Sequence, residues 1–271
     1  MFGSRGIELK TPDQLRAMQR SGAIVAEALA EARAAVRPGV TPRELDALCE
    51  RVIRGYGGVP NFLGYHGFPA TICASVNDVV VHGIPDDKPL SDGDVISIDC
   101  GAILEGWHSD SAITVPVGPV RPEVAELLRV TEESMWRGIG AVRQGGKIGD
   151  IGHAIETYVR GEGSYGVVEE YVGHGIGTAL HQPPNVPNFG RPGHGPKITR
   201  GMALAIEPML TLGTIDNRTL EDDWTVVTTD GSWAAHFEHS VGVFADGLVV
   251  LTAADGGRAD LERLGVPYAG D

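Results

Sequence analysis

Four carboxylates and three histidines in this chain have the residue types and positions expected of a metal-dependent hydrolase. Each lies near the end of a short apolar segment or in a glycine-rich loop: Asp99, Asp110, Glu207, Glu238, His82, His174 and His181. An oxygen-rich ligand set with one or two imidazoles suits Mn(II), Fe(II), Co(II) or Zn(II). The chain has no His-Glu-x-x-His motif, no P-loop and no Gly-x-Ser-x-Gly turn, which disfavours those chemistries. By themselves, these residues indicate a hydrolase with two metal ions.

Asp99 and Asp110 are predicted to face each other across a β-hairpin. Asp99 ends an apolar strand, and Leu104-Glu105-Gly106 is a turn sequence. A turn centred between Leu104 and Glu105 would put the two aspartates directly opposite, with Cβ atoms about 4.5–5.5 Å apart. Carboxylates at that distance repel, so they shift their pKa values or bind a cation. A solvated side chain is the better interpretation of Asp110 alone, but not of the pair.

Glu207 and Glu238 belong to two further predicted strands. Pro208 lacks a donor for the ladder and ends the strand that carries Glu207. Glu238 follows the turn sequence Asp230-Gly231, and alternation along its strand puts His236, Glu238 and Ser240 on one face. For either glutamate taken alone, an exposed position on a strand is the alternative interpretation.

The histidines lie in two different settings. His174 and His181 are the first and last residues of a segment that contains two glycines, Gly175 and Gly177. Pro183-Pro184 follows this segment. Glycine and proline disfavour a helix here, so we expect a Gly-rich loop that carries ligands. His82 ends a β-branched strand before a Gly-Ile-Pro turn, a position where a lone histidine is more often structural than catalytic.

The elements that must position these residues repeat along the chain. Capping boxes at Thr11 and Thr41 and hydrophobic periodicity predict helices over 12–36, 42–54, 123–142 and 148–159. The segments at Val36 and Val142 match at an offset of 106 residues, and 93–99 matches 201–207 at an offset of 108. Two nearly equal offsets favour an internal duplication over chance similarity. We therefore expect one catalytic domain over 1–271, with a short extension at 1–10 and halves at about 12–118 and 119–252.

Composition restricts the partners. The formal net charge of −14 argues against nucleic acid, because phosphate binding needs a basic surface. No apolar stretch is long enough to cross a membrane, and residues 1–10 lack the apolar core of an export signal. The three cysteines, Cys49, Cys73 and Cys100, lack metal-type spacing and indicate free thiols in a reducing compartment. We expect a cytoplasmic protein with no membrane and no nucleic-acid partner.

Over nearly its whole length the sequence resembles the type I methionine aminopeptidases. The motifs that carry the resemblance are Gly64-Tyr65-His66-Gly67-Phe68-Pro69, Asn77 to Pro85 around His82, Asp99 with Asp110, His174-Gly175-Ile176-Gly177 with His181, Ala205-Ile206-Glu207-Pro208, and Glu238-His239. The resemblance implies an α/β (α+β) pita-bread fold, in which two pseudo-symmetric halves surround a dinuclear metal site. It also implies removal of the initiator methionine from nascent proteins, with hydrolysis by a metal-activated water.

The resemblance further implies a role for each site residue. The metal ligands would be Asp99, Asp110, His174, Glu207 and Glu238, with Asp110 and Glu238 bridging two divalent ions. Those ions would be Co, Mn, Fe, Zn or Ni, and the family pattern leaves room for a monovalent cation. His181 would stabilise the oxyanion, His82 would contact the scissile amide nitrogen, and Glu207 would carry a proton to the leaving amine.

The remaining implied roles concern the substrate. The methionine pocket would include Tyr65, Phe68, Cys73 and Trp224, together with the substrate-contacting His82 and His181. The chain departs from the family at Leu180, where an aromatic residue is frequent. From the activity that the resemblance implies, we expect transient proximity to the ribosome, and we expect the protein to be a monomer.

Two alternatives stay open. X-Pro aminopeptidases and prolidases share the fold and the ligand set, but they usually carry an added N-terminal domain and lack the loop at 64–69. A binding protein of this fold without catalysis would usually have lost metal ligands, and all five positions are filled here. The 25 residues between His181 and Glu207 leave no space for the insertion that marks the type II enzymes.

Overall fold

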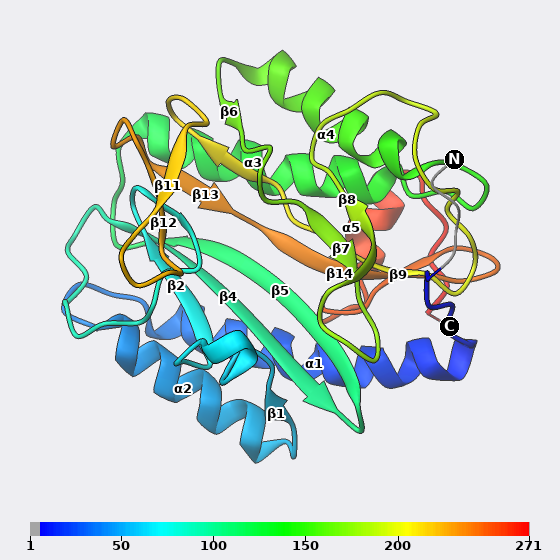
Figure 1. The fold of residues 1–271 in the computed structure, drawn as a ribbon, viewed down its shortest axis with the longest axis horizontal. Coiled ribbons are helices and arrows are strands. Elements are labelled where there is room, and N and C mark those ends of the chain that lie inside the picture. The colour runs from blue at the N-terminus through cyan, green and yellow to red at the C-terminus, as the bar shows by residue number, and fades with distance from the viewer. Residues whose placement is uncertain (1–5, 271) are drawn as a thin grey trace.

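The computed structural model describes residues 6–270 of the chain. Its helices are α1 (Pro12–Ala35), α2 (Pro42–Gly55), α3 (Pro122–Gly140), α4 (Ile148–Glu162) and α5 (Arg258–Arg263), with a 3₁₀ turn, η1 (Tyr65–Gly67). Its strands are β1 (Val59–Pro60), β2 (Ile72–Val76), β3 (Val79–Val81), β4 (Val95–Leu104), β5 (Trp107–Pro116), β6 (Gly166–Val167), β7 (Gly173–Gly175), β8 (Gln182–Val186), β9 (Ala203–Ile206), β10 (Met209–Thr211), β11 (Asn217–Thr219), β12 (Val226–Thr228), β13 (Ala234–His236), β14 (Glu238–Val243) and β15 (Leu248–Val250). Figure 1 shows their arrangement.

The first two helices begin at the predicted capping boxes. The Thr11 hydroxyl accepts a hydrogen bond from the Gln14 N–H at 3.3 Å, and the Gln14 side chain accepts one from the Thr11 N–H at 2.8 Å. Thr41 and Glu44 make the same reciprocal pair at the start of α2. These bonds satisfy N–H groups that have no partner within a helix. The four predicted helices are confirmed, with ends that differ by three residues or fewer.

A central antiparallel sheet joins the two halves of the chain. Its strand order is β1-β4-β5-β14-β9-β7-β8, with β2 also beside β4 and β15 beside β14. In one half of the sheet the strands lie in the order β2-β4-β5, and in the other half the corresponding order is β7-β9-β14. The two halves join where β5 pairs with β14. In the view of Figure 1, α1 and α2 lie at the lower side of the molecule, and α3 and α4 lie at its upper side. The arrangement is the pseudo-symmetric one expected from the repeat, while the boundaries 12–118 and 119–252 stay a prediction.

The two helix pairs cover the same face of the sheet, each pair over its own half. One apolar cluster joins α1 and α2 to β4 and β5, and it includes Leu29, Leu45, Ile53, Ile96 and Ile98. A second cluster joins α3 and α4 to β9 and β14, and it includes Leu127, Ile139, Ile155, Leu204, Ile206 and Val241. Side chains alternate between the two faces of a strand. The intervening positions, among them Asp99, Ala205 and Ser240, therefore point to the opposite face of the sheet.

The register of the β4–β5 hairpin corrects one prediction. Glu105 and Gly106 form the turn, with φ angles of 51° and 83°, as a type I′ hairpin requires. Asp99 is consequently opposite Ala112, and Asp110 is opposite Gly101. The prediction that the two aspartates lie directly opposite was wrong. The two aspartates are instead diagonal neighbours on one face of the sheet. Residues in this relation are about 7–8 Å apart, farther than directly opposite residues, but their side chains can still reach a shared ligand.

The position of the two aspartates within their strands also differs from the prediction. Asp99 lies in the middle of β4, because the small residues Cys100, Gly101 and Ala102 continue the ladder to Leu104. Asp110 likewise lies inside β5. These carboxylates are therefore held by hydrogen-bonded strands on both sides, and they do not depend on a strand end for their placement.

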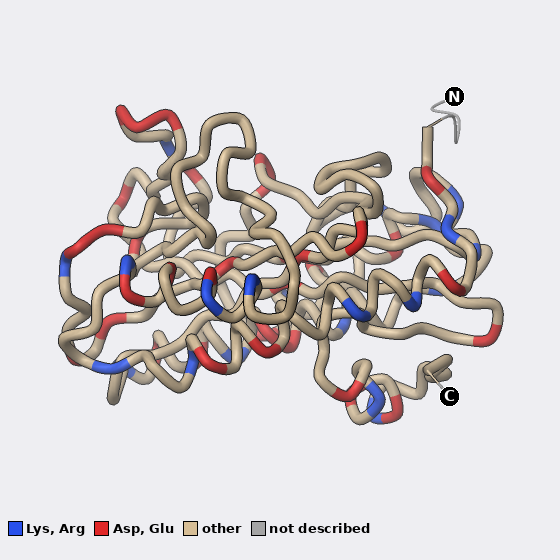
Figure 2. Tube along the Cα trace, turned by 90° about the horizontal axis from the view of Figure 1, so that it is seen from below, with Lys and Arg blue, Asp and Glu red and all other residues tan. Residues whose placement is uncertain are grey.

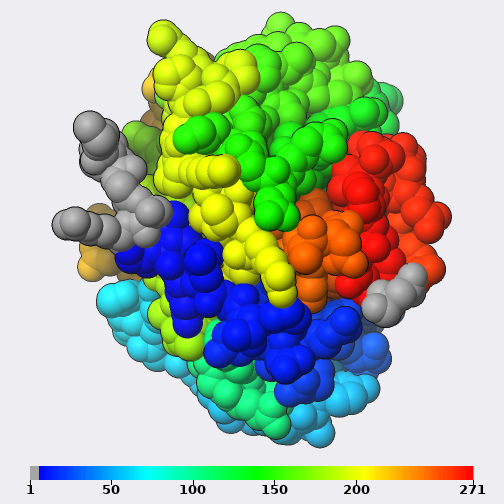
Figure 3. Space-filling model, turned by 90° about the vertical axis from the view of Figure 1, so that its right-hand side faces the viewer, coloured from blue at the N-terminus to red at the C-terminus, as the bar shows by residue number. Residues whose placement is uncertain are grey.

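The N-terminal segment is bound to the second half of the molecule. The Lys10 N–H donates to the Gly201 carbonyl at 2.7 Å, and the buried Lys10 ammonium lies 3.4 Å from Gln182 Oε1 and 3.5 Å from Glu8. Figure 3 shows this segment, in blue, lying against the yellow part of the chain. Of the predicted extension 1–10, residues 1–5 lie outside the described residues.

The surface carries charges of both signs. Lys and Arg are interspersed with Asp and Glu along the helices and loops (Figure 2). Between residues 6 and 270, no helix is both long and apolar enough to cross a membrane. The cysteines Cys49, Cys73 and Cys100 are buried free thiols, as the sequence predicts.

The close packing of α1 generates a stability prediction. A Cβ atom added at Gly22 would lie 2.0 Å from the Leu251 carbonyl oxygen, well inside van der Waals contact. Gly22→Ala should therefore lower the free energy of unfolding by about 2 kcal/mol or more, since the helix must move away from β15 and its neighbours. Urea unfolding followed by circular dichroism measures this change.

A matched control is available in α4. Gly161 has open space around its Cα atom, so Gly161→Ala should stabilise the protein by up to about 1 kcal/mol through helix propensity. The two identical substitutions are thus expected to have opposite signs. Equal effects at the two positions would contradict the close approach of α1 to Leu251.

Candidate metal centre

Two neighbouring rows of residues across the sheet carry the candidate ligands. In the first row, Cys73 is opposite Asp99, Asp99 is opposite Ala112, and Ala112 is opposite Glu238. The next pair along β14, His239 with Ile206, places Glu238 beside Glu207. One row therefore carries three carboxylates that come from β4, β14 and the end of β9.

The second row supplies an aspartate and a histidine. Asp110 and Ser240 are joined by two hydrogen bonds, from the Asp110 N–H to Ser240 Oγ and from Ser240 Oγ to the Asp110 carbonyl. Ser240 is opposite Ala205. On the far side of β9, Gly175 is opposite Leu204, which sets His174 beside Ala205. The sheet register thus brings together residues that lie up to 139 positions apart in the sequence, from Asp99 to Glu238.

Small residues between the ligands leave space above the sheet. Ala112, Ala205 and Ser240 separate the candidate ligands within the two rows. A cavity of about 190 Å³ opens at this place. Every side chain that the sequence selected lines the cavity: Tyr65, Phe68, Cys73, His82, Asp99, Asp110, His174, His181, Glu207, Trp224 and Glu238. The structure therefore brings the whole predicted set together, and the roles of its members stay predictions.

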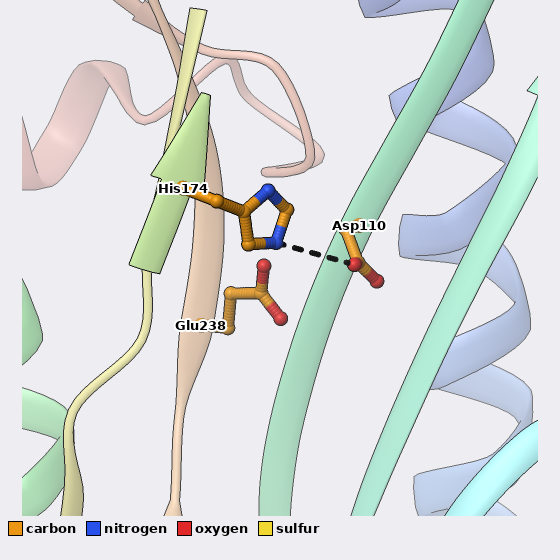
Figure 4. Close-up of side chains that lie close together, drawn as sticks. All are labelled: Asp110, His174 and Glu238. Atoms are coloured by element: carbon orange, nitrogen blue, oxygen red, sulfur yellow. Dashed lines mark ion pairs between the residues drawn. The ribbon is translucent and has the colours of Figure 1, made fainter. Parts of the chain in front are cut away.

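His174 has the environment of a metal-binding imidazole. Its Nδ1–H donates to the Gly175 carbonyl at 3.0 Å, which leaves the lone pair of Nε2 free for a ligand. Nε2 lies 3.4 Å from Glu207 Oε1 and 3.9 Å from Asp110 Oδ2. Burial lowers the pKa of His174 to about 3, so the ring is neutral. Figure 4 shows this imidazole pointing toward Asp110, with Glu238 beside it.

The carboxylates are held in an environment that opposes their charge. Burial, and then the neighbouring carboxylates, raise the pKa values of Asp110 and Glu238 well above the usual range. Burial raises the pKa of Asp99 to about 7 and that of Glu207 to about 8. Four acidic groups this close can all ionise only if cations or protons offset their mutual repulsion.

Unpaired polar atoms in the cavity fit bound cations. Asp99 Oδ1, Asp110 Oδ1 and Glu238 Oε1 are buried and have no hydrogen-bond partner among residues 6–270. An unpartnered buried oxygen is costly, and a divalent ion would remove that cost. Donor atoms of Asp110, His174 and Glu238 lie within 4.8 Å of one another, and so do those of Glu207, His236 and Glu238. Glu238 belongs to both groups, and Glu207 Oε1 lies 3.4 Å from His174 Nε2, so the two groups adjoin.

Two further histidines border the cavity on loops. His181 precedes β8, and its Nδ1 lies 2.8 Å from the hydroxyl of Tyr65. His82 follows β3 with a left-handed φ of 59°, and its ring is in edge contact with Tyr171 and Trp224. Burial, then His236 and His181, lower the pKa of His82 to about 4. Both rings are therefore held in place by aromatic neighbours.

The expectations for the histidine-bearing segments are mostly met. The segment from His174 to His181 contains no helix, but His174 itself lies in the short strand β7 and not in a loop. The reason is that Gly173 and Gly175 let this strand approach β9 and β8 closely, since a Cβ at either glycine would meet a backbone oxygen at 2.3 Å.

One wall of the cavity is apolar. The rings of Phe68 and Trp224 are in edge contact, with centroids 5.1 Å apart. Cys73 lies beside them, and burial raises its pKa well above the ordinary value, so its thiol is neutral and behaves as a small apolar group. Leu180 also lines this wall. The cavity thus has an acidic floor, formed by Asp99, Asp110, Glu207 and Glu238, and an apolar wall.

Several lining residues were not selected from the sequence. They are Phe62, Val81, Tyr171, Val172, Met209 and His236. His236 had a detectable signal, because alternation places it on the face of Glu238. The others lie in loops or short strands without a periodic pattern.

Comparisons with known proteins agree with this geometry. Residues 16–245 match the model of metallopeptidase family M24. A methionine aminopeptidase of Clostridium acetobutylicum is 48% identical over 250 residues, which cover 92% of this chain and 100% of the relative. Methionine aminopeptidase 1 of Mycobacterium tuberculosis is 50% identical over 256 residues, covering 92% of this chain and 96% of the relative.

Solved structures show the same fold. The crystal structure of methionine aminopeptidase from Rickettsia prowazekii has a TM-score of 0.89 and 42% identity, covering 91% of this chain and 99% of that one. The prolidase from Pyrococcus furiosus has a TM-score of 0.73 at 20% identity, covering 90% of this chain and 65% of that one. The pita-bread fold expected from the sequence is confirmed.

The carboxylate cluster predicts how the metal-free protein responds to pH. The pKa of Asp99 rises from 3.8 to about 7 on folding, and that of Glu207 from 4.5 to about 8. Above about pH 7 histidines are largely neutral in both the folded and the unfolded state, while the folded state still holds protons on these carboxylates. The free energy of unfolding should therefore fall as pH rises, and urea unfolding with a chelator present, from about pH 7 to about pH 9, measures this dependence.

Metal addition and one substitution test whether the carboxylates cause this pH dependence. Co(II) or Mn(II) should stabilise the protein most at the higher pH, where cations replace the lost protons. Asp99→Asn should flatten the dependence, whereas the same change at the exposed Asp246 should leave it unaltered. A metal-free protein that becomes more stable between about pH 7 and about pH 9 would contradict the raised pKa values.

Proposed function

This chain belongs to metallopeptidase family M24, and we propose that it removes N-terminal methionine from peptides with two divalent metal ions bound in the cavity. Its relatives that are 48–50% identical over most of the chain are methionine aminopeptidases. The observation that carries the proposal is the cluster of four carboxylates, three of which have a buried, unpartnered oxygen, beside a neutral imidazole. The apolar wall beside that cluster suits the methionine side chain.

Five side chains would hold the ions. As the family resemblance implies, Glu238, which belongs to both donor groups, and Asp110, which lies 3.9 Å from His174 Nε2, would contact both ions. Asp99 would complete the ligand set of one ion, and His174 and Glu207 that of the other. Four carboxylates balance the charge of two divalent cations, which is consistent with burial of the whole set.

Divalent ions bound here would acidify a water molecule and polarise the scissile carbonyl. The protein's own groups complete the reaction. His181 would donate a hydrogen bond to the carbonyl oxygen as negative charge develops there. His82, neutral because of its burial, would contact the scissile amide nitrogen. Glu207 would carry a proton to the leaving amine through whichever carboxylate oxygen is free of metal.

The methionine side chain would lie against the apolar wall. Tyr65, Phe68, Cys73 and Trp224 offer aromatic and sulfur surfaces, with which a thioether makes favourable contacts. Leu180, buried at the same wall, is smaller than an aromatic ring. It would leave the pocket wider than in relatives with an aromatic residue at this place.

The two alternative functions are less well supported. Prolidase similarity is limited to the fold, at 20% identity, while the aminopeptidase relatives are more than twice as similar in sequence. Retention of a complete donor set argues against a binding protein without catalysis. We further propose that the protein acts as a cytoplasmic monomer on nascent chains near the ribosome. The ions belong to the Co, Mn, Fe, Zn and Ni series, and an added monovalent cation stays a prediction.

Substitution of a shared ligand tests the proposal. Asp110→Asn should lower kcat/KM for Met-Ala-Ser by about 10³-fold and reduce the bound metal, because one side chain contacts both ions. His153→Gln, exposed on α4, is the control and should have no effect. Full activity of Asp110→Asn with both ions present would sink the ligand assignment. Faster cleavage of an X-Pro dipeptide than of Met-Ala-Ser by the wild type would favour the prolidase alternative.

The hydrogen bond between Tyr65 and His181 gives a second prediction. If His181 donates to the substrate through Nε2–H, its Nδ1 must accept from the Tyr65 hydroxyl, 2.8 Å away. Tyr65→Phe should then lower kcat by about tenfold, equivalent to one ordinary hydrogen bond, while the ring keeps the apolar contact and KM changes little. Steady-state kinetics with Met-Ala-Ser measures both constants.

A double-mutant cycle supplies the control for this bond. In a His181→Ala background, Tyr65→Phe should have no further effect on kcat, since the partner is gone. An undiminished effect in that background would show that Tyr65 acts independently of His181.

A further inference from the structure

His236 is a buried histidine in the cavity that the mechanism above does not use. His236 is 2% exposed, and its Nε2 atom is buried without a hydrogen-bond partner among the described residues. The ring lines the cavity together with the candidate metal ligands. A ring nitrogen buried in this way costs free energy, so the atom calls for a partner that the protein itself does not provide.

The main chain fixes this ring firmly. His236 ends β13, where it is opposite Met209 of β10. Its N–H donates to Thr114 Oγ1 at 2.9 Å, and Thr114 Oγ1 donates to its carbonyl at 2.7 Å. Thr114 belongs to β5, the strand of Asp110. The imidazole is therefore anchored to the same sheet as the carboxylates.

Its position relative to Glu207 closely parallels that of His174. His174 Nε2 lies 3.4 Å from Glu207 Oε1, and His236 Nε2 lies 3.6 Å from Glu207 Oε2. A separation of 3.6 Å is too long for a hydrogen bond. It does fit two donors on one ion, since metal bonds of about 2.0–2.2 Å allow at most about 4.4 Å between donors.

A third donor completes the arrangement. One ligand atom from each of Glu207, His236 and Glu238 lies within 4.8 Å of the other two. By the distances that make His174 a candidate ligand, His236 qualifies equally. A role only in filling space would leave unexplained why a polar ring nitrogen points at two carboxylates.

We propose that His236 is a further metal ligand. It would bind through Nε2 the ion that His174 and Glu207 hold and that Glu238 also contacts. This inference rests on the proposed two-metal function and adds one donor to its ligand set. The centre then has two imidazoles, from His174 and His236, in place of one. Added nitrogen ligation favours Co(II), Ni(II) and Zn(II) over Mn(II), which binds oxygen donors by preference.

The direct test is a crystal structure of the wild-type protein loaded with Co(II). The expected result is a Co–Nε2 bond from His236 of about 2.0–2.3 Å, like that from His174. A cobalt ion bound by the carboxylates and His174 but more than about 3 Å from His236 Nε2 would overturn the inference, since no coordination bond is that long.

Metal affinities of variants provide the second test, by competition with a coloured chelator. His236→Gln should weaken Co(II) binding by about tenfold or more and Mn(II) binding clearly less, so the Co(II)/Mn(II) affinity ratio falls. His153→Gln is the matched control and should leave both affinities unchanged. An unchanged ratio in folded His236→Gln protein would refute ligation by His236.

Glu238→Gln separates this inference from the proposed function. If it abolishes tight binding of both metals while His236→Gln has no effect, the two-metal centre stands and only the role of His236 is refuted. If neither substitution changes metal binding, the proposed function itself fails. Thermal unfolding of each variant establishes that the comparison is made on folded protein.

Discussion

Mutual repulsion among four buried carboxylates is the constraint on which this molecule depends. Asp99, Asp110, Glu207 and Glu238 stand in two adjacent rows of one sheet, and burial raises the pKa of each. In the absence of cations the cluster must hold protons at neutral pH, which opposes folding as those protons are lost. A fold that keeps such a cluster must bind cations there, and every nearby feature can be explained as support for that binding.

The sheet solves the problem of holding like charges together. Residues on one face come from β4, β5, β14 and β9, while the alternate residues pack against α1 to α4. Moving a carboxylate away from its neighbours would therefore pull an apolar residue such as Ile98 or Val241 out of its core. Small side chains at Ala112, Ala205 and Ser240 keep the space above the rows open. The hydrophobic cores thus supply the energy that holds the acidic groups in place.

The same alternation explains what could be predicted from the sequence. The helices followed from capping boxes and periodicity, which act within one turn of the chain. The face shared by Asp99 and Asp110 followed from the parity of their numbers, which the actual turn at Glu105-Gly106 leaves unchanged. Their exact pairing did not follow, because moving the turn centre by one residue moves each partner by two. The position of Asp99 within β4 was also missed, since Cys100 to Ala102 carry no strong strand signal.

Local sequence patterns could not predict which residues from distant segments meet in the folded chain. His174 and Glu238 were selected through family resemblance, because nothing within their own segments shows which strand of the sheet they adjoin. His236 shows the limit most clearly. Its spacing from Glu238 was visible, yet the distance of 3.6 Å to Glu207 arises from the pairing of β13 with β10 and from the bonds to Thr114. Only the folded chain reveals that its ring nitrogen points at the carboxylates.

The acidic floor and the apolar wall rest on different kinds of structure. The carboxylates project from paired strands whose register cannot shift without exposing both cores. Apart from Cys73 on β2, the apolar wall and its border come from η1 and from loops. There Tyr65 contacts His181 through its ring and one hydrogen bond, and the rings of His82 and Trp224 are in edge contact. Loop positions tolerate substitution far better than paired strands. Substrate preference can therefore change at the wall, through residues such as Leu180, while the chemistry of the floor stays fixed by the sheet.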